Sequence, residues 1–194
     1  MTTIIFAHPW HGSFNKAILD RVIEQLNLKD QNYKLIDLHK DNFDPVLREE
    51  DLKLYSQGKS SDQLVLNYQS ILKETKKLVF IFPIWWFDVP AILKGFIDKV
   101  MLKNFAYSES ASGLKGKLSN ITNTIVITTS ESPTWYLKFF AGNPIENNLI
   151  KNTLRAIGLK NIQWLNSSQT KSGSDRQRAR FLKQIGNHFN DYIT

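Results

Sequence analysis

Short apolar segments alternate with longer amphipathic ones along this chain, and this rhythm restricts the fold more than any other feature. The short segments are apolar at nearly every position, which is typical of strands that are buried on both faces of a sheet. They cover residues 3–7, 34–38, 77–82, 124–129 and 161–165. Strands that alternate with helices predict an α/β fold in which helices cover both faces of a parallel sheet.

The segments between the strands have the period of amphipathic helices. We predict helices over residues 14–26, after Pro90, over residues 147–157 with an end at Gly158, and from about residue 174 onward. After Pro90 the expected buried face consists of Ile92, Leu93, Phe96, Ile97 and Val100. Five strands in this rhythm predict the doubly wound order 2-1-3-4-5 of flavodoxin-like folds. No linker or repeat interrupts residues 1–194, so we expect a single domain.

The chain is basic, with a formal net charge of +7 and a pI near 9.5, and it therefore attracts anions. Phosphate-bearing cofactors and nucleic acid are both anionic, so charge alone does not choose between them. The densest basic run, residues 176–183, lies on a predicted helix whose other face is apolar. This pattern favours a solvated helix surface over a nucleic-acid site.

Cysteine is absent, which excludes disulfide bonds, thiolate catalysis and cysteine-bound metals. The first residues contain no basic segment and only a short apolar run, so we expect no signal peptide. No later segment approaches the roughly 20 apolar residues that a membrane-spanning helix needs. We therefore expect a cytoplasmic protein without membrane insertion.

Three loops follow the predicted strands that end near residues 7, 82 and 129, where doubly wound folds bind their ligands. In the first loop, His8 is followed by Ser13, Phe14 and Asn15 at the start of a predicted helix. Backbone N–H groups at a helix N-terminus, together with a hydroxyl group, suit a phosphate. The alternative is that Ser13 or Asn15 only caps the helix.

The same loop argues against two common nucleotide sites and against a metal site. It contains neither the GxGxxG pattern of dinucleotide-binding folds nor the pattern of a P-loop. His8 and His11 are too few to hold zinc, and His39 and His188 are expected at exposed positions far away in sequence. We predict no metal.

The second loop carries three adjacent aromatic residues, which cannot all face one core. It contains Pro83, Ile84, Trp85, Trp86 and Phe87. Rings left at a surface edge would contact a flat ligand, and the position after a central strand favours that interpretation. The alternative is that these rings belong to the core or to a contact between two subunits.

The third loop begins with Thr128, Thr129 and Ser130 and continues to Trp135 and Tyr136. Its hydroxyl groups can hydrogen-bond to the edge of a ring or to a polyol chain. Because such residues are common in loops, this loop supports a ligand site only in combination with the other two.

Taken together, these residues resemble the flavodoxin-like NAD(P)H dehydrogenase (quinone) family, which includes quinone reductases, modulators of drug activity and ancillary reductases of potassium-efflux systems. The most specific part is the run Trp-Phe-x-Val-Pro-Ala-Ile-Leu-Lys-Gly at residues 86–95. The likeness covers nearly the whole chain. Several positions depart from the family pattern: Ser130 and Glu131 replace a pair of glycines, Asp88 replaces a small residue, and Gly142 stands where the eukaryotic enzymes have a histidine.

The resemblance implies a bound flavin, FMN or FAD, with a slight preference for FMN. His8, Ser13, Phe14 and Asn15 would contact its phosphate and ribityl portion. Residues 83–87 would line the isoalloxazine ring, with the N–H groups of Trp86 and Phe87 toward its N5 and O4 edge. Thr128 and Thr129 would lie at the pyrimidine end, with Ser130 as a further cofactor-binding residue. Tyr136 would be the catalytic residue that assists charge development.

The activity that the resemblance implies is hydride transfer from NAD(P)H through flavin N5 to a quinone or similar acceptor. Both substrates would use one place in turn, which predicts ping-pong kinetics. We also expect a homodimer with the flavin sites at its interface. An accessory or regulatory flavin- or nucleotide-binding subunit with little turnover, for example of a potassium-efflux system, is the alternative, and a nucleic-acid-binding domain fits the aromatic loops poorly.

Overall fold

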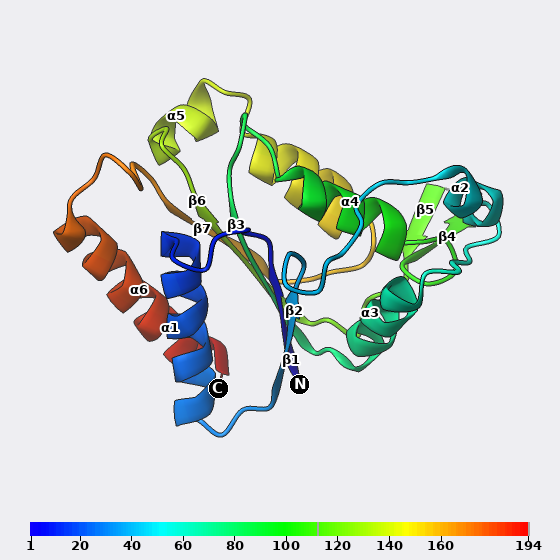
Figure 1. Ribbon diagram of the computed structural model, residues 1–194, viewed down its shortest axis with the longest axis horizontal. Coiled ribbons are helices and arrows are strands. Elements are labelled where there is room, and N and C mark those ends of the chain that lie inside the picture. Colours follow the sequence, from blue (N-terminus) through cyan, green and yellow to red (C-terminus); the bar gives the residue numbers. More distant parts are fainter. Residues whose placement is uncertain (112, 194) are drawn as a thin grey trace.

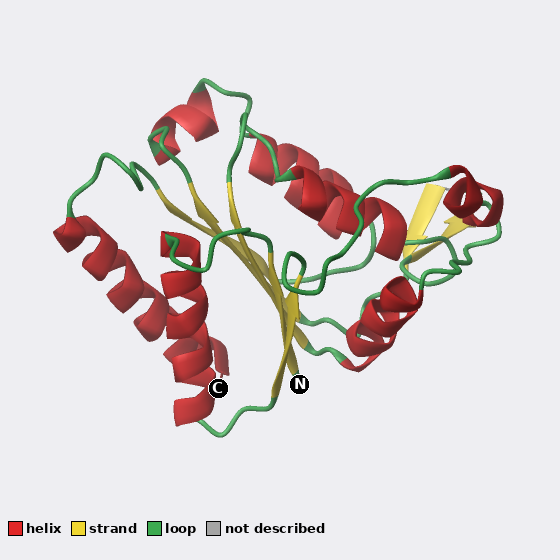
Figure 2. Ribbon diagram, in the orientation of Figure 1, coloured by secondary structure: helices red, strands yellow, loops and turns green. Residues whose placement is uncertain are grey.

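A computed structural model describes residues 1–111 and 113–193, so positions 112 and 194 of the predicted domain lie outside the described residues. Within these ranges, five parallel strands form one sheet, drawn in yellow in Figure 2. They are β1 (Thr2–Phe6), β2 (Tyr33–Asp37), β3 (Lys77–Pro83), β6 (Asn123–Thr129) and β7 (Ile162–Ser167). Their order, β2-β1-β3-β6-β7, is the predicted 2-1-3-4-5 order, which is thereby confirmed.

Helices cover both faces of this sheet, as predicted (Figure 1). One face carries α1 (Phe14–Leu28) and α6 (Asp175–Ile193), and the other carries α3 (Gln63–Glu74), α4 (Ala91–Val100) and the helix η1 (Ile145–Leu154). Successive side chains of a strand point to opposite faces. In β1, Ile4 and Phe6 therefore pack into the core with α1 and α6, while Ile5 packs into the core on the other face. No helix among the described residues is long and apolar enough to cross a membrane.

Two predicted helices differ in detail. The helix predicted over residues 147–157 is a π-helix, in which the N–H of Arg155 donates to the carbonyl of Ile150, five residues back, at 3.0 Å. Sequence periodicity does not distinguish this wider winding from an α-helix over so short a segment. In α4 the expected buried face is only partly correct, because Ile92 and Ile97 are half-buried.

Besides helix α3, four elements lie in segments for which no element was predicted. They are helix α2 (Glu49–Tyr55), helix α5 (Thr134–Phe139), and the antiparallel strands β4 (Tyr107–Ser110) and β5 (Gly113–Gly116). Helix α3 was not predicted either, although it buries Val65, Tyr68 and Leu72. In Figure 1, α2 lies beside the β4–β5 pair at the right, and α5 lies above the carboxyl ends of the central strands.

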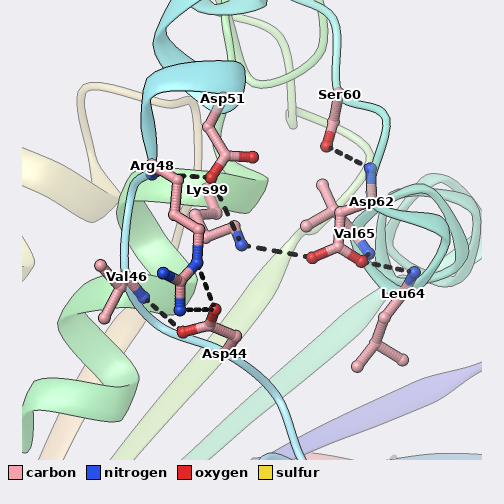
Figure 3. Close-up of polar contacts among 9 residues, drawn as sticks. All are labelled: Asp44, Val46, Arg48, Asp51, Ser60, Asp62, Leu64, Val65 and Lys99. Carbon is pink, nitrogen blue, oxygen red and sulfur yellow. Dashed lines mark hydrogen bonds and ion pairs between the residues drawn. The ribbon is translucent and has the colours of Figure 1, made fainter.

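Helix α2 contributes no buried side chain, and a buried lysine connects it to α3 and α4 (Figure 3). The side chain of Lys99 is only 5% exposed, and its ammonium lies 3.2 Å from the carboxylate of Asp62 and 3.7 Å from that of Asp51. Asp62 caps α3 by accepting from the N–H of Leu64 at 2.9 Å. Asp51 accepts from the N–H of Arg48 at 2.9 Å at the start of α2. Lys99 therefore joins the N-terminal carboxylates of two helices.

Helix α4 also meets the segment before α2 at a glycine. A β-carbon built at Gly95 would overlap the backbone of Pro45, including its carbonyl oxygen. Glycine is therefore required here by a close approach of two backbones, although it lies in the interior of a helix.

Candidate functional site

The carboxyl ends of β1, β3 and β6 surround a pocket of about 420 Å³ at the N-terminus of α1. We call it the polar pocket. The residues predicted for cofactor binding that line it are His8, Ser13, Phe14, Asn15, Pro83, Ile84, Trp85, Thr129 and Ser130. The structure thus brings together residues from all three loops, at the edge of the sheet where doubly wound folds bind ligands.

A second pocket of about 210 Å³ adjoins the first. Both pockets are lined by Ile84, Ser130 and Glu131. The second is also lined by Trp86 and Phe87, and we call it the aromatic pocket. An elongated ligand that passes Ile84 would therefore contact polar groups at one end and aromatic rings at the other.

Thr128 and Tyr136 line neither pocket. The hydroxyl of Thr128 is buried, donates to Asn166 Oδ1 at 2.7 Å and accepts from Trp164 Nε1 at 2.8 Å. Tyr136 lies on α5 beside the aromatic pocket, where its ring centroid is 6.3 Å from that of Phe87. Thr128 therefore supports the wall of the site from behind, while Tyr136 stands next to it.

Asn15 supplies a buried polar group without a partner at the polar pocket. Its amide nitrogen donates to the hydroxyl of Thr129 at 2.9 Å, and its carbonyl oxygen is buried without a hydrogen bond. Such orphan atoms are uncommon in native proteins, so a donor from a ligand would complete this group. Ser13 caps α1 by accepting from the N–H of Lys16 at 3.2 Å, which agrees with the capping interpretation of that residue.

His8 is oriented by the loop that contains it. Its Nδ1 lies 3.1 Å from both the backbone nitrogen and the carbonyl oxygen of Trp10, so it accepts from the N–H in one tautomer and donates to the carbonyl in the other. Partial burial lowers the pKa of His8 below the ordinary value of 6.5, in spite of an opposing contribution from the Trp10 hydrogen bond. The lowered pKa favours the neutral ring near pH 7, and the ring lies beside that of Trp85, with 6.0 Å between the two ring centroids.

The aromatic loop forms a tight turn. Trp85 and Asp88 exchange two backbone hydrogen bonds of 3.0 Å, and Trp86 and Phe87 between them have φ values of 50° and 63°. These features match a type I′ turn, which normally contains asparagine and glycine. Within the described part of the chain, the N–H groups of Trp86 and Phe87 meet no acceptor. They are available to a ligand, as the family resemblance implies.

Asp88 has a structural explanation. Its backbone closes the turn, and its carboxylate accepts from the N–H of Val89 at 2.7 Å, just before the proline that precedes α4. The departure from the family pattern at this position is therefore compatible with the site.

The other histidines lie outside the two pockets. His11 Nε2 lies 2.8 Å from Asp37 Oδ2. His39 and His188 are half-buried, each with an Nε2 atom that is buried and without a partner, so the expectation that they are exposed was wrong. Among the described residues, no group of three histidine or acidic side chains has an arrangement that could hold a metal ion.

A family model for the flavodoxin-like fold matches residues 1–189. The chain belongs to this family. The predicted family and fold are therefore confirmed, together with the predicted class of enzyme, an oxidoreductase of this family.

Named relatives of this flavodoxin-like chain are oxidoreductases. An uncharacterized NAD(P)H oxidoreductase of Haemophilus influenzae is 31% identical over 163 residues, which cover 83% of this chain and 80% of that protein. NAD(P)H dehydrogenase (quinone) 1 of Cavia porcellus is 31% identical over 150 residues, which cover 69% of this chain but only 54% of that enzyme. The crystal structure of Smu.1420 from Streptococcus mutans superimposes with a TM-score of 0.84, at 29% identity and 98% coverage of both chains.

Sequence reasoning missed one wall of the flavodoxin-like site. Trp10, Thr170 and Lys171 line the polar pocket, and none of them was a predicted site residue. Thr170 and Lys171 follow β7, the last strand of the sheet, and nothing in their composition marks them. The available signal was position, because the loop after the last strand reaches the same edge of a parallel sheet as the three loops that were considered.

Proposed function

We propose that this chain is a flavin-dependent NAD(P)H oxidoreductase that delivers electrons to a quinone or a similar small acceptor. The observation that carries this proposal is the pair of adjoining pockets, which share Ile84, Ser130 and Glu131. One pocket ends at the N-terminus of a helix, and the other is lined by aromatic rings. The names of the relatives from Haemophilus influenzae and Cavia porcellus support the same activity.

The residues present fit a flavin. The unpaired amide oxygen of Asn15 suits a hydroxyl donor of a ribityl chain, and the N-terminus of α1 suits a phosphate. The free N–H groups of Trp86 and Phe87 suit acceptors on the edge of a ring. We favour FMN slightly over FAD, as the sequence indicates, and expect His8, Ser13, Phe14, Pro83, Trp85, Thr129 and Ser130 to complete the contacts, with Thr128 behind them.

A bound flavin would supply the redox chemistry, the transfer of a hydride through its N5 from NAD(P)H to the acceptor. If NAD(P)H and the acceptor use one place in turn, the kinetics should be ping-pong. The chain supplies stacking surfaces, hydrogen bonds and exclusion of water. Tyr136 is the residue that we expect to stabilise developing negative charge with its hydroxyl. Replacing Tyr136 by Phe should reduce turnover by about tenfold, the loss expected for one hydrogen bond, while flavin affinity stays unchanged.

The direct test is the visible spectrum of the purified protein before and after incubation with FMN or FAD, followed by mass analysis of the released cofactor. We then expect NADH or NADPH oxidation with menadione as the acceptor. A protein that stays colourless with both flavins would refute the proposal. A flavin-loaded protein with negligible turnover would instead favour the accessory role.

We also propose that the protein works as a homodimer. Support comes from the exposed rings of Trp86, Trp135, Phe139 and Phe140 beside the aromatic pocket. Large exposed apolar patches on a folded protein mark interaction sites.

A further inference from the structure

The loop after β7 forms one wall of the polar pocket and is attached to the loop after β6. The N–H of Thr170 donates to the carbonyl of Ser130 at 3.1 Å, and the N–H of Ser130 donates to the carbonyl of Ser167 at 2.9 Å. Both Thr170 and Lys171 line the pocket. The wall therefore depends on contacts between two loops that are about 40 residues apart in sequence.

The middle of this wall is held by a carboxylate. One oxygen of Glu131 accepts from the backbone N–H of Lys171, and the other accepts from the hydroxyl of Ser172 at 3.0 Å. The hydrogen bond from the Lys171 backbone is the largest cause of a lowered pKa for Glu131, so the side chain is ionised near neutral pH. Both oxygens are thus engaged with the wall.

The end of the wall is anchored independently of Glu131. Arg178 on α6 donates from one nitrogen to the carbonyls of Thr170 at 2.9 Å and Gly173 at 2.8 Å. Gln169, at the start of the wall, has a φ of 54°, a conformation that glutamine disfavours. Loss of the Glu131 contacts should therefore release Lys171 and Ser172 without detaching the loop at its ends.

The charge balance of the polar pocket makes Lys171 important. Among the described residues that line this pocket, Glu131 is the one acidic residue, and its oxygens are occupied by the wall. Of the described lining residues, Lys171 is the one lysine or arginine, and it shares the pocket with the N-terminus of α1. The buried unpaired oxygen of Asn15 indicates independently that a ligand enters this pocket.

We propose that Glu131 is a positioning residue that keeps Lys171 at the polar pocket, where the lysine favours a nucleotide that carries a phosphate over its unphosphorylated form. This inference rests on the proposed flavin site. It gives a role to a glutamate that occupies a position where the family pattern has glycine.

The test compares affinities for FMN and for riboflavin, which lacks the phosphate, by quenching of flavin fluorescence. The unmodified protein should prefer FMN. Replacing Lys171 by Gln should reduce that preference by about tenfold, as expected for a charge-assisted contact of about 1.4 kcal/mol, and leave riboflavin affinity unchanged. Glu131→Ala should reduce the preference for FMN by a similar factor. If the carboxylate only repelled the phosphate, removing its negative charge would raise that preference instead.

Two further variants sharpen the test. The double variant with Lys171→Gln and Glu131→Ala should lose no more of the preference for FMN than Lys171→Gln alone, because both substitutions act through the same lysine. Lys160→Gln removes the same charge from an exposed position outside the pockets and should keep the full preference. Because the readout is a ratio of two ligands on one folded sample, lower stability of a variant does not imitate the expected result.

The outcomes separate the two proposals. If the unmodified protein binds neither FMN, FAD nor riboflavin, the proposed function fails and this inference fails with it. If it prefers FMN but both single variants keep the full preference, the inference about Glu131 is overturned while the flavin site stands. An increase in FMN preference in Glu131→Ala also overturns it, because repulsion by the carboxylate would then outweigh positioning.

Discussion

Trp86 and Phe87 adopt backbone conformations that their side chains disfavour. Both have positive φ values in a turn that usually contains asparagine and glycine. Each such residue costs on the order of 1–3 kcal/mol. Trp86 is also 96% exposed, so burial of its own ring does not offset this strain. The backbone of this turn therefore lowers the stability of the fold, which is typical of segments whose conformation serves ligand binding.

The double substitution of Trp86 by Asn and Phe87 by Gly tests this interpretation. Relief of the backbone strain should raise the free energy of unfolding by about 1–3 kcal/mol, while loss of both rings should weaken flavin binding. The matched control replaces both residues by Ala, which removes the rings but keeps both β-carbons. Thermal or denaturant unfolding gives the stabilities, and equal stability of the two double variants would argue against strain.

Two histidines make stability dependent on pH in the mildly acidic range. Burial lowers the pKa values of His8 and His39 below 6.5, so the folded state binds these protons less readily than the unfolded state. The unfolded state gains protons first as the pH falls below 6.5, and stability decreases through this window. The lowered pKa values of Asp44 and Glu131 act only at lower pH, below about 4.5, where those carboxylates become protonated.

We expect the melting temperature of the ligand-free protein to be lower at about pH 5.5 than at about pH 7.5. In a variant with Gln in place of both His8 and His39, the melting temperature should fall by a smaller amount when the pH is lowered over the same range. His188→Gln, at a site remote from the pockets, serves as the comparison for a change of histidine content. A melting temperature that rises toward acid pH would contradict the assignment.

At the scale of elements, Lys99 compensates for the weak packing of α2. That helix has no fully buried side chain, and only Leu54 and Tyr55 among its apolar residues are half-buried, so hydrophobic burial contributes little to holding it against α4. The contacts of Lys99 with Asp51 and Asp62 connect the N-terminal carboxylates of α2 and α3 to α4 instead (Figure 3). Since both carboxylates are only partly buried, they would regain some hydration if the lysine were removed.

Replacing Lys99 by Met should lower the free energy of unfolding by about 2–3 kcal/mol, somewhat less than for a fully buried pair. Hydrogen exchange should increase first at residues 48–65 and much less in the sheet. Lys53→Met, which removes an exposed partner of Glu49 on α2, is the matched control, with an expected change below about 0.5 kcal/mol. Uniform loss of protection over the whole chain would show that Lys99 has no local role.

The elements predicted from the sequence are ones whose burial repeats regularly, although α3, which also buries Val65, Tyr68 and Leu72, was missed. The strands of the sheet and helices α1, α4 and α6 have clear apolar patterns, and their order determines where the three loops meet. Helix α2 has no buried residue and therefore no pattern, and the β4–β5 pair exposes Leu114. The position of residues 83–87 was predictable, but their turn was not, because tryptophan and phenylalanine are not residues that indicate a type I′ turn.

At the scale of the whole molecule, aromatic rings gather at the carboxyl end of the sheet. On α5 and after it, Trp135, Tyr136 and Phe140 contact one another, with the rings of Tyr136 and Phe140 stacked at 6.1 Å. Phe139 and Phe140 are 77% and 71% exposed. An aromatic surface of this kind beside an open pocket favours a second copy of the chain as its cover.

Light scattering coupled to size-exclusion chromatography, over a range of concentrations, should show a dimer. Replacing Phe139 and Phe140 by Ser should raise the dissociation constant by at least about tenfold, because aromatic residues commonly dominate such interfaces. Leu28→Ser is the control, since Leu28 is 71% exposed at the end of α1, away from α5. A monomer at all concentrations would refute the homodimer.

The contact between Gly95 and Pro45 has a consequence for engineering. Glycines inside helices are common targets for thermostabilisation, since alanine is favoured there by up to about 1 kcal/mol. At Gly95 the added methyl group would meet the Pro45 backbone and displace the chain that leads to α2. Gly95→Ala should therefore lower the free energy of unfolding by about 1–3 kcal/mol in a denaturant titration. Unchanged or higher stability of Gly95→Ala would mean that the Pro45 segment moves aside easily. A loss of stability would mean that helix propensity alone is a misleading guide to stabilising this protein at Gly95.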